Sequence, residues 1–92
     1  MTVKDPAYKA FVARLKRARR EAGLKQVEVA DQLGKPQSYI AKSEAGDRRV
    51  DVVELLGFAR LYRKPLDWFV ADVAGQGGPA DQPAVAVDER KP

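Results

Sequence analysis

The amino-acid sequence predicts an all-α fold, in which five short helices form one compact domain and a flexible tail follows. The 92 residues suffice for one modest hydrophobic core and not for two. Apolar side chains recur at three- and four-residue spacing, which is typical of amphipathic helices. No run of strict apolar and polar alternation is long enough for a β-sheet. We therefore expect a helical domain over residues 1–74 and a tail over residues 75–92.

The first helix is expected to begin at Pro6, because Asp5 can cap it and proline is favoured at the first helical position. Gly23 supplies a left-handed stop, after which Leu24 can fold back onto the end of the helix. The apolar side chains between these signals form one stripe, which consists of Tyr8, Phe11, Val12, Leu15, Ala18 and Ala22.

Start and stop signals place four shorter helices after the first. Asp51, with Glu54 three residues later, matches a capping box at the start of one of them. Their expected positions are about 26–33, 36–44, 51–62 and from 65 onward. Their expected inward side chains are Val29, Ala30, Leu33, Tyr39, Ile40, Val52, Leu55, Leu56, Ala59, Tyr62, Leu66, Trp68 and Phe69. The flexible tail is predicted from five residues that interrupt regular secondary structure, which are Gly75, Gly77, Gly78, Pro79 and Pro83.

Missing residue types exclude several kinds of chemistry. The chain has no cysteine and no histidine, which excludes disulfides, thiolate nucleophiles, Cys/His zinc sites and histidine acid–base catalysis. No motif joins the remaining reactive side chains, so we expect neither an enzyme nor a cofactor nor a metal. No apolar run approaches the roughly 18 residues of a membrane span, and no secretory signal precedes the first helix. These features indicate a cytoplasmic protein without a membrane partner.

Positive charge is concentrated at the start of the chain. The formal net charge is +4, and residues 1–22 alone carry seven basic side chains against two acidic ones, a net of +5. An asymmetry of this kind suits a polyanion held on one side of the molecule. A solvated helix face that aids solubility would give the same pattern.

The residues from Gln26 to Glu44 have the spacing of a helix-turn-helix. In this motif two helices cross steeply through a tight turn, so the first needs a small residue at the crossing. Ala30 meets that need, and Gly34 accepts a positive φ in the turn without a steric penalty. The apolar side chains that would lock the two helices together are Val29, Leu33 and Ile40.

This combination resembles the Cro/phage-repressor type (XRE-like) helix-turn-helix family, over roughly residues 8–70. The resemblance rests on the stretch from Leu24 to Gly46 and extends through Val52, Leu55, Ala59, Leu66 and Phe69. It implies a lambda-repressor-like domain whose third helix enters the major groove of DNA. The implied function is sequence-specific, major-groove DNA binding by a transcriptional regulator, most simply a repressor. A helical hairpin without such a use is the alternative.

Matching the family position by position implies two sets of DNA contacts. Gln37, Ser38 and Lys42 correspond to base-reading positions, where an amide suits adenine and an ammonium suits guanine. Each could instead be an ordinary solvated residue, and Ser38 could contact a phosphate. Gln26 matches a position that meets the DNA backbone at a helix N-terminus. The other phosphate candidates flank the same face, and they are Lys25, Lys35, Arg48 and Arg49.

The resemblance also assigns Arg19 and Glu44 to an internal ion pair between the first and third helices, although Arg19 could instead contact a phosphate. Two positions depart from the family pattern. Ser43 stands where the family places a large apolar residue, so Phe58 or Leu61 is expected to fill that space. Val50 replaces a common proline, which should matter little.

Helices four and five carry more apolar surface than one small core requires. We assign Trp68, Val70 and Leu61 to a symmetric homodimer contact, which would place two recognition helices on a palindromic operator. Trp68 could equally complete the core of one chain. An alternative function is that of an antitoxin that binds a toxin protein through the tail and regulates its own operon. A third is an adaptor between proteins, which would leave Gln37 and Lys42 without a role.

Overall fold

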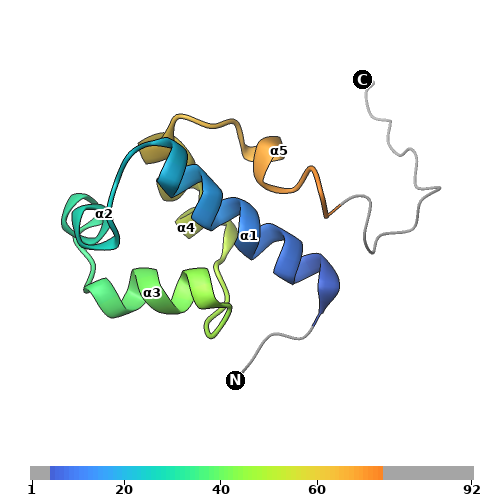
Figure 1. Ribbon diagram of the computed structural model, residues 1–92, viewed down its shortest axis with the longest axis horizontal. Coiled ribbons are helices and arrows are strands. Elements are labelled where there is room, and N and C mark those ends of the chain that lie inside the picture. Colours follow the sequence, from blue (N-terminus) through green and yellow to red (C-terminus); the bar gives the residue numbers. More distant parts are fainter. Residues whose placement is uncertain (1–4, 74–92) are drawn as a thin grey trace.

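The computed structural model describes residues 5–73, and these residues fold into five α-helices without a strand, as predicted. Figure 1 shows the helices in chain order around the long first helix. The tail expected over residues 75–92 lies outside the described residues. The helices are α1 (Pro6–Glu21), α2 (Gln26–Leu33), α3 (Gln37–Ala45), α4 (Val52–Tyr62) and α5 (Leu66–Phe69).

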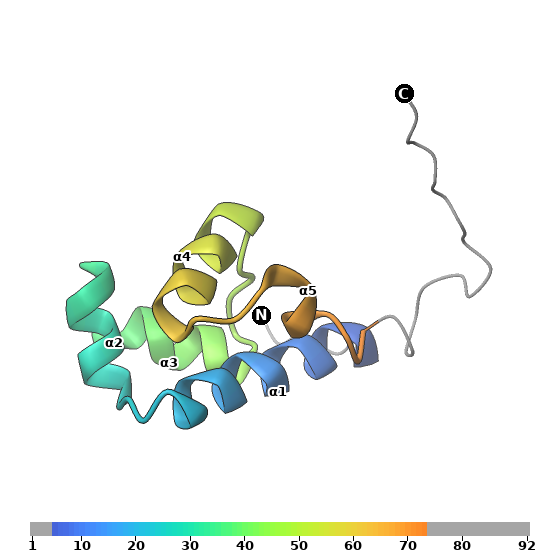
Figure 2. The ribbon, with the colours of Figure 1, turned by 90° about the horizontal axis from the view of Figure 1, so that it is seen from above.

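Helix α1 forms the base on which α3, α4 and α5 pack (Figure 2). The side chain of Asp5 caps it by accepting a hydrogen bond from the Ala7 amide at 2.9 Å, and Pro6 occupies its first position, as predicted. Phe11, Leu15 and Ala18 are its buried side chains. The expected stripe is wrong at Ala22, which is exposed because the helix has already ended there.

The turn between α2 and α3 closes as the spacing predicts. Gly34 has a φ of 66°, and the Lys35 amide donates to the Ala30 carbonyl at 2.9 Å across the turn. Val29, Ala30 and Ile40 are buried where the helices meet. In Figure 1 α2 is seen almost end-on and α3 side-on, so the two helices cross steeply.

Helix α4 begins with the predicted capping box. The Asp51 carboxylate accepts from the Glu54 amide at 2.8 Å, and the Glu54 carboxylate accepts from the Asp51 amide at 2.9 Å. The inward assignment is wrong at Val52, whose side chain is 70% exposed, and at Leu66, which is 41% exposed. Both residues open their helices at the edge of the core, so the shared helical face has nothing to cover them there.

The core is centred on Phe58. Its ring is fully buried and stacks between Tyr39 and Tyr62, with ring centroids 6.2 and 5.9 Å away. Of the two residues expected to compensate for Ser43, Phe58 is fully buried, whereas Leu61 is only half-buried. Burial of Tyr62, followed by the negative charge of Glu44, raises the pKa of its phenol above the ordinary value.

Two ion pairs join α1 to the chain on either side of α5, and a third within α1 shares one of their carboxylates. Arg14 binds Asp72 through two hydrogen bonds of 2.9 and 3.2 Å. The Glu21 carboxylate accepts from Lys64 at 2.6 Å and from Arg17 at 2.8 Å. The last turn of α1 is thereby tied to the connection between α4 and α5.

Two glycines allow a matched test of the turn. Gly34→Ala should lower the free energy of unfolding by about 1 kcal/mol, because a Cβ is unfavourable at positive φ although nothing lies within 4 Å of it. Gly57→Ala in α4 should raise it by about 0.5–1 kcal/mol, since the added Cβ would meet only Leu33 Cδ2 at 3.9 Å. Urea unfolding measures both changes, and equal effects of the two substitutions would contradict this account of Gly34.

The acidic limit of stability should depend on Glu21. Hydrogen bonds from Lys64 and then Arg17 lower the pKa of this carboxyl from 4.5 to about 2 in the folded chain. Because the folded state binds the proton less well, this stabilisation is present above pH 4.5 and is lost as the pH falls toward 2. Thermal unfolding between pH 2 and 6 should therefore show a smaller pH dependence for Glu21→Gln than for the wild type. Identical profiles would show that the pair does not form in solution.

Candidate nucleic-acid interface

The three predicted base-reading residues share the exposed side of α3. Gln37, Ser38 and Lys42 are all exposed, while Ile40 and Glu44 on the same helix are buried. Each residue turns a helix by about 100°, so these three positions lie within about 140° of one another and face solvent as a broad exposed side. The structure thus leaves free the surface that a recognition helix needs.

A chain of hydrogen bonds connects this surface to the interior. The Gln37 side-chain amide donates to the Gln26 side-chain oxygen at 3.5 Å, which is a long contact. The Gln26 amide donates in turn to Glu44 Oε1 at 3.1 Å. The first residue of α2 is therefore bound to both ends of α3.

Arg19 and Glu44 form an ion pair beneath this chain of hydrogen bonds. Arg19 Nε donates to Glu44 Oε2 at 2.7 Å, and Arg19 Nη1 donates to the Leu24 carbonyl at 2.8 Å. Glu44 is only 6% exposed, so its charge depends on these donors for compensation. The hydrogen bond to Glu44 raises the pKa of Arg19 above its ordinary value. With its guanidinium so engaged, Arg19 serves the packing of α1 against α3.

The phosphate candidates differ in how freely they can reach DNA. Lys25, Lys35 and Arg49 are exposed, and Gln26 is half-buried at the start of α2. Lys35 Nζ lies 5.2 Å from the centre of the Tyr39 ring, so the turn side chain is held near α3 by a cation–π contact. These four residues surround the beginnings of α2 and α3 and the turn after α3.

Arg48, the fifth phosphate candidate, is held inside the chain. Its guanidinium binds both oxygens of Glu54, at 3.2 and 2.9 Å, and lies 4.3 Å from the centre of the Tyr39 ring. A further contact of 3.4 Å reaches the hydroxyl of Ser43, which itself donates to the Tyr39 carbonyl at 2.7 Å. The same hydrogen bonds lower the pKa of Glu54.

This cluster gives the small polar residue at position 43 a physical reason. Ser43 is fully buried, yet its hydroxyl both donates and accepts a hydrogen bond. Sequence reasoning assigned Glu54 to helix capping alone and so missed its pairing with Arg48. The spacing of six residues across a turn carries no signal for such a pair.

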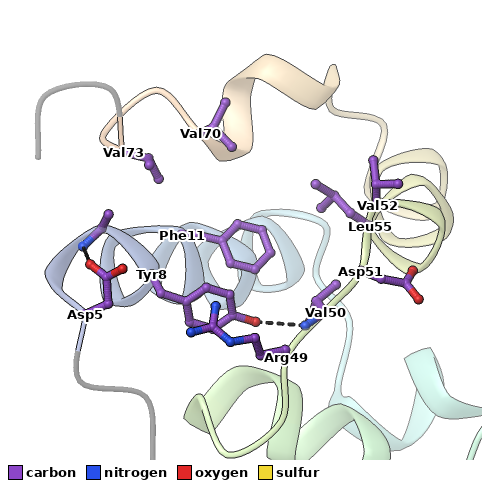
Figure 3. A pocket seen from close by; sticks show the side chains of 11 residues that line it. Asp5, Tyr8, Phe11, Arg49, Val50, Asp51, Val52, Leu55, Val70 and Val73 are labelled. Carbon is purple, nitrogen blue, oxygen red and sulfur yellow. Dashed lines mark hydrogen bonds between the residues drawn. The ribbon is translucent and has the colours of Figure 1, made fainter. Parts of the chain in front are cut away.

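Tyr8 attaches the segment after α3 to α1, a role that the sequence did not reveal. Its hydroxyl accepts from the Val50 amide at 2.8 Å and donates to the Arg48 carbonyl at 3.5 Å, and the former contact is drawn in Figure 3. Arg49 lies over the ring of Tyr8, with its guanidinium carbon 4.7 Å from the ring centre. A tyrosine 42 residues away thus fixes the course of the chain after α3.

Comparisons with known proteins agree with this arrangement. The family model described as Helix-turn-helix matches residues 15–69. Among solved structures, the chain is similar to an XRE-family like protein from Pseudomonas syringae pv. tomato str. DC3000. The two share 35% sequence identity and a TM-score of 0.67, over 75% of this chain and 84% of the other. The chain belongs to the XRE family of helix-turn-helix proteins. A search of curated proteins found no match.

Family membership makes this XRE-family chain a DNA-binding transcriptional regulator, with a fold that is typically regulatory rather than catalytic. Within residues 5–73, no group of acidic side chains is placed to hold a metal ion. No helix in that described part is long and apolar enough to cross a membrane.

The predicted dimer residues of the XRE-family chain lie in different surroundings. Leu61 is half-buried and Val70 is 42% exposed. Trp68 packs edge-on against Phe69, with ring centroids 5.1 Å apart. The Arg14 guanidinium and the Lys64 ammonium lie 4.6 and 4.5 Å from the centre of the Trp68 ring, as cation–π contacts. Much of the Trp68 ring is therefore used within one chain. Sequence reasoning missed the most exposed apolar pair, Val52 and Val53, which are 70% and 73% exposed.

Removing Arg19 should destabilise the XRE-family domain strongly. Arg19→Met leaves the buried Glu44 carboxylate with Gln26 as its remaining side-chain donor, and we expect a loss of about 3 kcal/mol. The double variant Arg19→Met/Glu44→Met removes the stranded charge and should recover part of that loss. Denaturant unfolding of the wild type and the variants, with Glu44→Met completing the cycle, measures the coupling. Additive effects would show that the two side chains do not interact.

Proposed function

We propose that this XRE-family protein is a repressor that reads a specific duplex sequence by placing α3 in the major groove. The observation that carries the proposal is the two-sided character of α3. One side exposes Gln37, Ser38 and Lys42, while Glu44 on the other is fastened to α1 and α2. A helix held from behind by directional bonds can present its free side chains in a fixed register, which base readout requires.

The free side chains of α3 suit the edges of bases. A glutamine amide can donate to and accept from adenine, which fits Gln37, and the Lys42 ammonium can donate to O6 or N7 of guanine. Ser38 accepts and donates, so it suits several bases or a phosphate. In the free protein Gln37 is oriented by Gln26, at 3.5 Å, before any base is present. We assign Gln37 and Lys42 the larger share of sequence preference.

Four other residues are proposed to contact phosphates. Lys25 and Gln26 lie at the N-terminus of α2, where the helix dipole favours an anion, and Lys35 and Arg49 flank α3. Arg48 would have to leave both oxygens of Glu54 to join them. We therefore propose that Arg48 braces the turn after α3 and is a minor phosphate contact at most.

A homodimer is proposed to bind a palindromic operator in the cytoplasm. Two recognition helices reach successive major grooves only when they are about 34 Å apart, which one small domain cannot achieve. Half-buried Leu61 and Trp68 are proposed to lie at the dimer contact, with Val70 at its edge. The antitoxin alternative depends on a tail, residues 75–92, that lies outside the described residues.

The DNA-binding proposal is tested first by selecting bound duplexes from a random pool, which should enrich a palindrome. Anisotropy titration on that site should show Lys42→Ala losing about 1–3 kcal/mol there and much less on random DNA. Lys35→Ala is the matched comparison, because a lost phosphate contact weakens both duplexes alike and lowers the salt slope by about 1. Absence of an enriched sequence, with weak binding at physiological salt, would overturn the proposal. A stable protein partner copurified instead would favour the antitoxin.

A further inference from the structure

An open apolar groove of about 340 Å³ lies between the start of α1, the start of α4 and the chain after α5 (Figure 3). The polar groups along it are largely occupied: Tyr8 bonds the Val50 amide, and Asp5 and Asp51 each cap a helix. The groove therefore offers apolar surface rather than free hydrogen-bonding groups. Its apolar walls are formed by Phe11, Val50, Val52, Leu55, Val70 and Val73.

Both ends of the described chain border this groove. Asp5 and Val73 are the first and last described residues, and each lines it. Residues 74–92 follow Val73 in the sequence, and they contain one apolar run, Ala-Val-Ala-Val, at 84–87. The ten residues 74–83 that precede this run can span up to about 33 Å, which is enough to return it to the groove.

Charge favours this C-terminal run, rather than residues 1–4, as the segment that occupies the groove. Arg49 stands at the rim of the groove, and no ion pair among residues 5–73 involves it. Asp88 and Glu89 follow the apolar run directly, whereas Lys4 would bring a second cation beside Arg49. Arg90 and Lys91 come next, and two acidic residues, Asp5 and Asp51, also line the groove.

We propose that residues 84–87 of the same chain dock in this groove and that the docked segment weakens DNA binding. In an extended segment Val85 and Val87 share one face, so both side chains can enter the apolar groove. Asp88 and Glu89 then lie against Arg49. This effect on DNA rests on the proposed function, because Arg49 is one of the proposed phosphate contacts.

Through competition for Arg49, the docked segment would inhibit DNA binding by its own chain. A phosphate and an acidic side chain cannot both occupy the guanidinium, so docking must loosen before that phosphate contact forms. Two valines are a small apolar gain against the closure of a loop, so the docked and free states should exchange. If the segment is docked about two thirds of the time, the apparent affinity for DNA falls about threefold.

Docking is tested on the full chain by paramagnetic NMR. Because the chain has no cysteine, Pro92→Cys accepts a single spin label. The label should broaden the amides of Phe11, Val50, Val52 and Val70, and Val85→Ser/Val87→Ser should abolish this broadening. The matched control Ala84→Ser/Ala86→Ser changes the alternate positions and should retain it. Broadening that is absent, or equal in all three proteins, would overturn the proposal.

A mixed sample separates docking within one chain from docking on a second copy. Isotope-labelled chains without the spin label are combined with spin-labelled chains that carry no isotope. Little broadening is expected in this mixture, and strong broadening would overturn docking in the same chain in favour of a second copy. If another apolar partner occupied the groove instead, the label on residue 92 would not broaden the amides that line it. That result would overturn the proposal.

The effect of docking on DNA affinity is tested by fluorescence anisotropy on the enriched operator at low salt. Val85→Ser/Val87→Ser should bind about threefold more tightly than wild type, and Ala84→Ser/Ala86→Ser should bind equally to wild type. Unchanged affinity of the valine variant would overturn the competition for Arg49. If the wild type binds no specific DNA, the proposed function fails, and the NMR result still decides whether the segment docks.

Discussion

The ion pair between Arg19 and Glu44 is the constraint on which the placement of the recognition helix depends. It joins the longest helix to the far end of α3, and through Gln26 it also reaches the start of α2. A buried carboxylate tolerates few alternative positions, because each displacement leaves charge without a donor. The pair contributes orientation more than net stability, since a hydrophobic replacement of both members can be equally stable.

The interior face of α3 explains why polar contacts, more than apolar packing, orient this helix. Among its buried side chains Ile40 is the only apolar one, and Ser43 and Glu44 are the others. Apolar packing is tolerant of small rotations, whereas hydrogen bonds weaken steeply when their angles change. The Ser43 hydroxyl donates within α3 to the Tyr39 carbonyl and accepts from Arg48, so it joins the end of α3 to the turn that follows. Apolar packing reaches α3 from α4, where the Phe58 ring stacks on Tyr39.

Local signals allowed most of the fold to be predicted. Asp5 with Pro6, and Asp51 with Glu54, mark helix starts through contacts that span three residues or fewer. Gly34 marks the turn because few other residues tolerate its φ of 66°. Val52 was misassigned because periodicity identifies a helical face but does not reveal where the core ends.

The candidate site was predictable in its residue types and less so in its internal contacts. The exposure of the predicted base-reading residues on α3 followed from motif spacing, since a helix fixes which positions face outward. The bonds of Tyr8 to Val50 and of Arg48 to Glu54 depend on the path of the chain between α3 and α4. That path is set by tertiary packing, so no pattern in the sequence announces it.

The segment from Arg48 to Asp51 consequently joins stability to recognition. Arg48 turns inward to Glu54 while its neighbour Arg49 turns outward over Tyr8, so adjacent arginines have opposite environments. Arg48 lies in the bend after α3, so the chain changes direction there and the two side chains meet different neighbours. One arginine closes the turn that ends the recognition helix, and the other remains available at the surface. Because the Val50 amide that follows them donates to Tyr8, the same segment is also attached to α1.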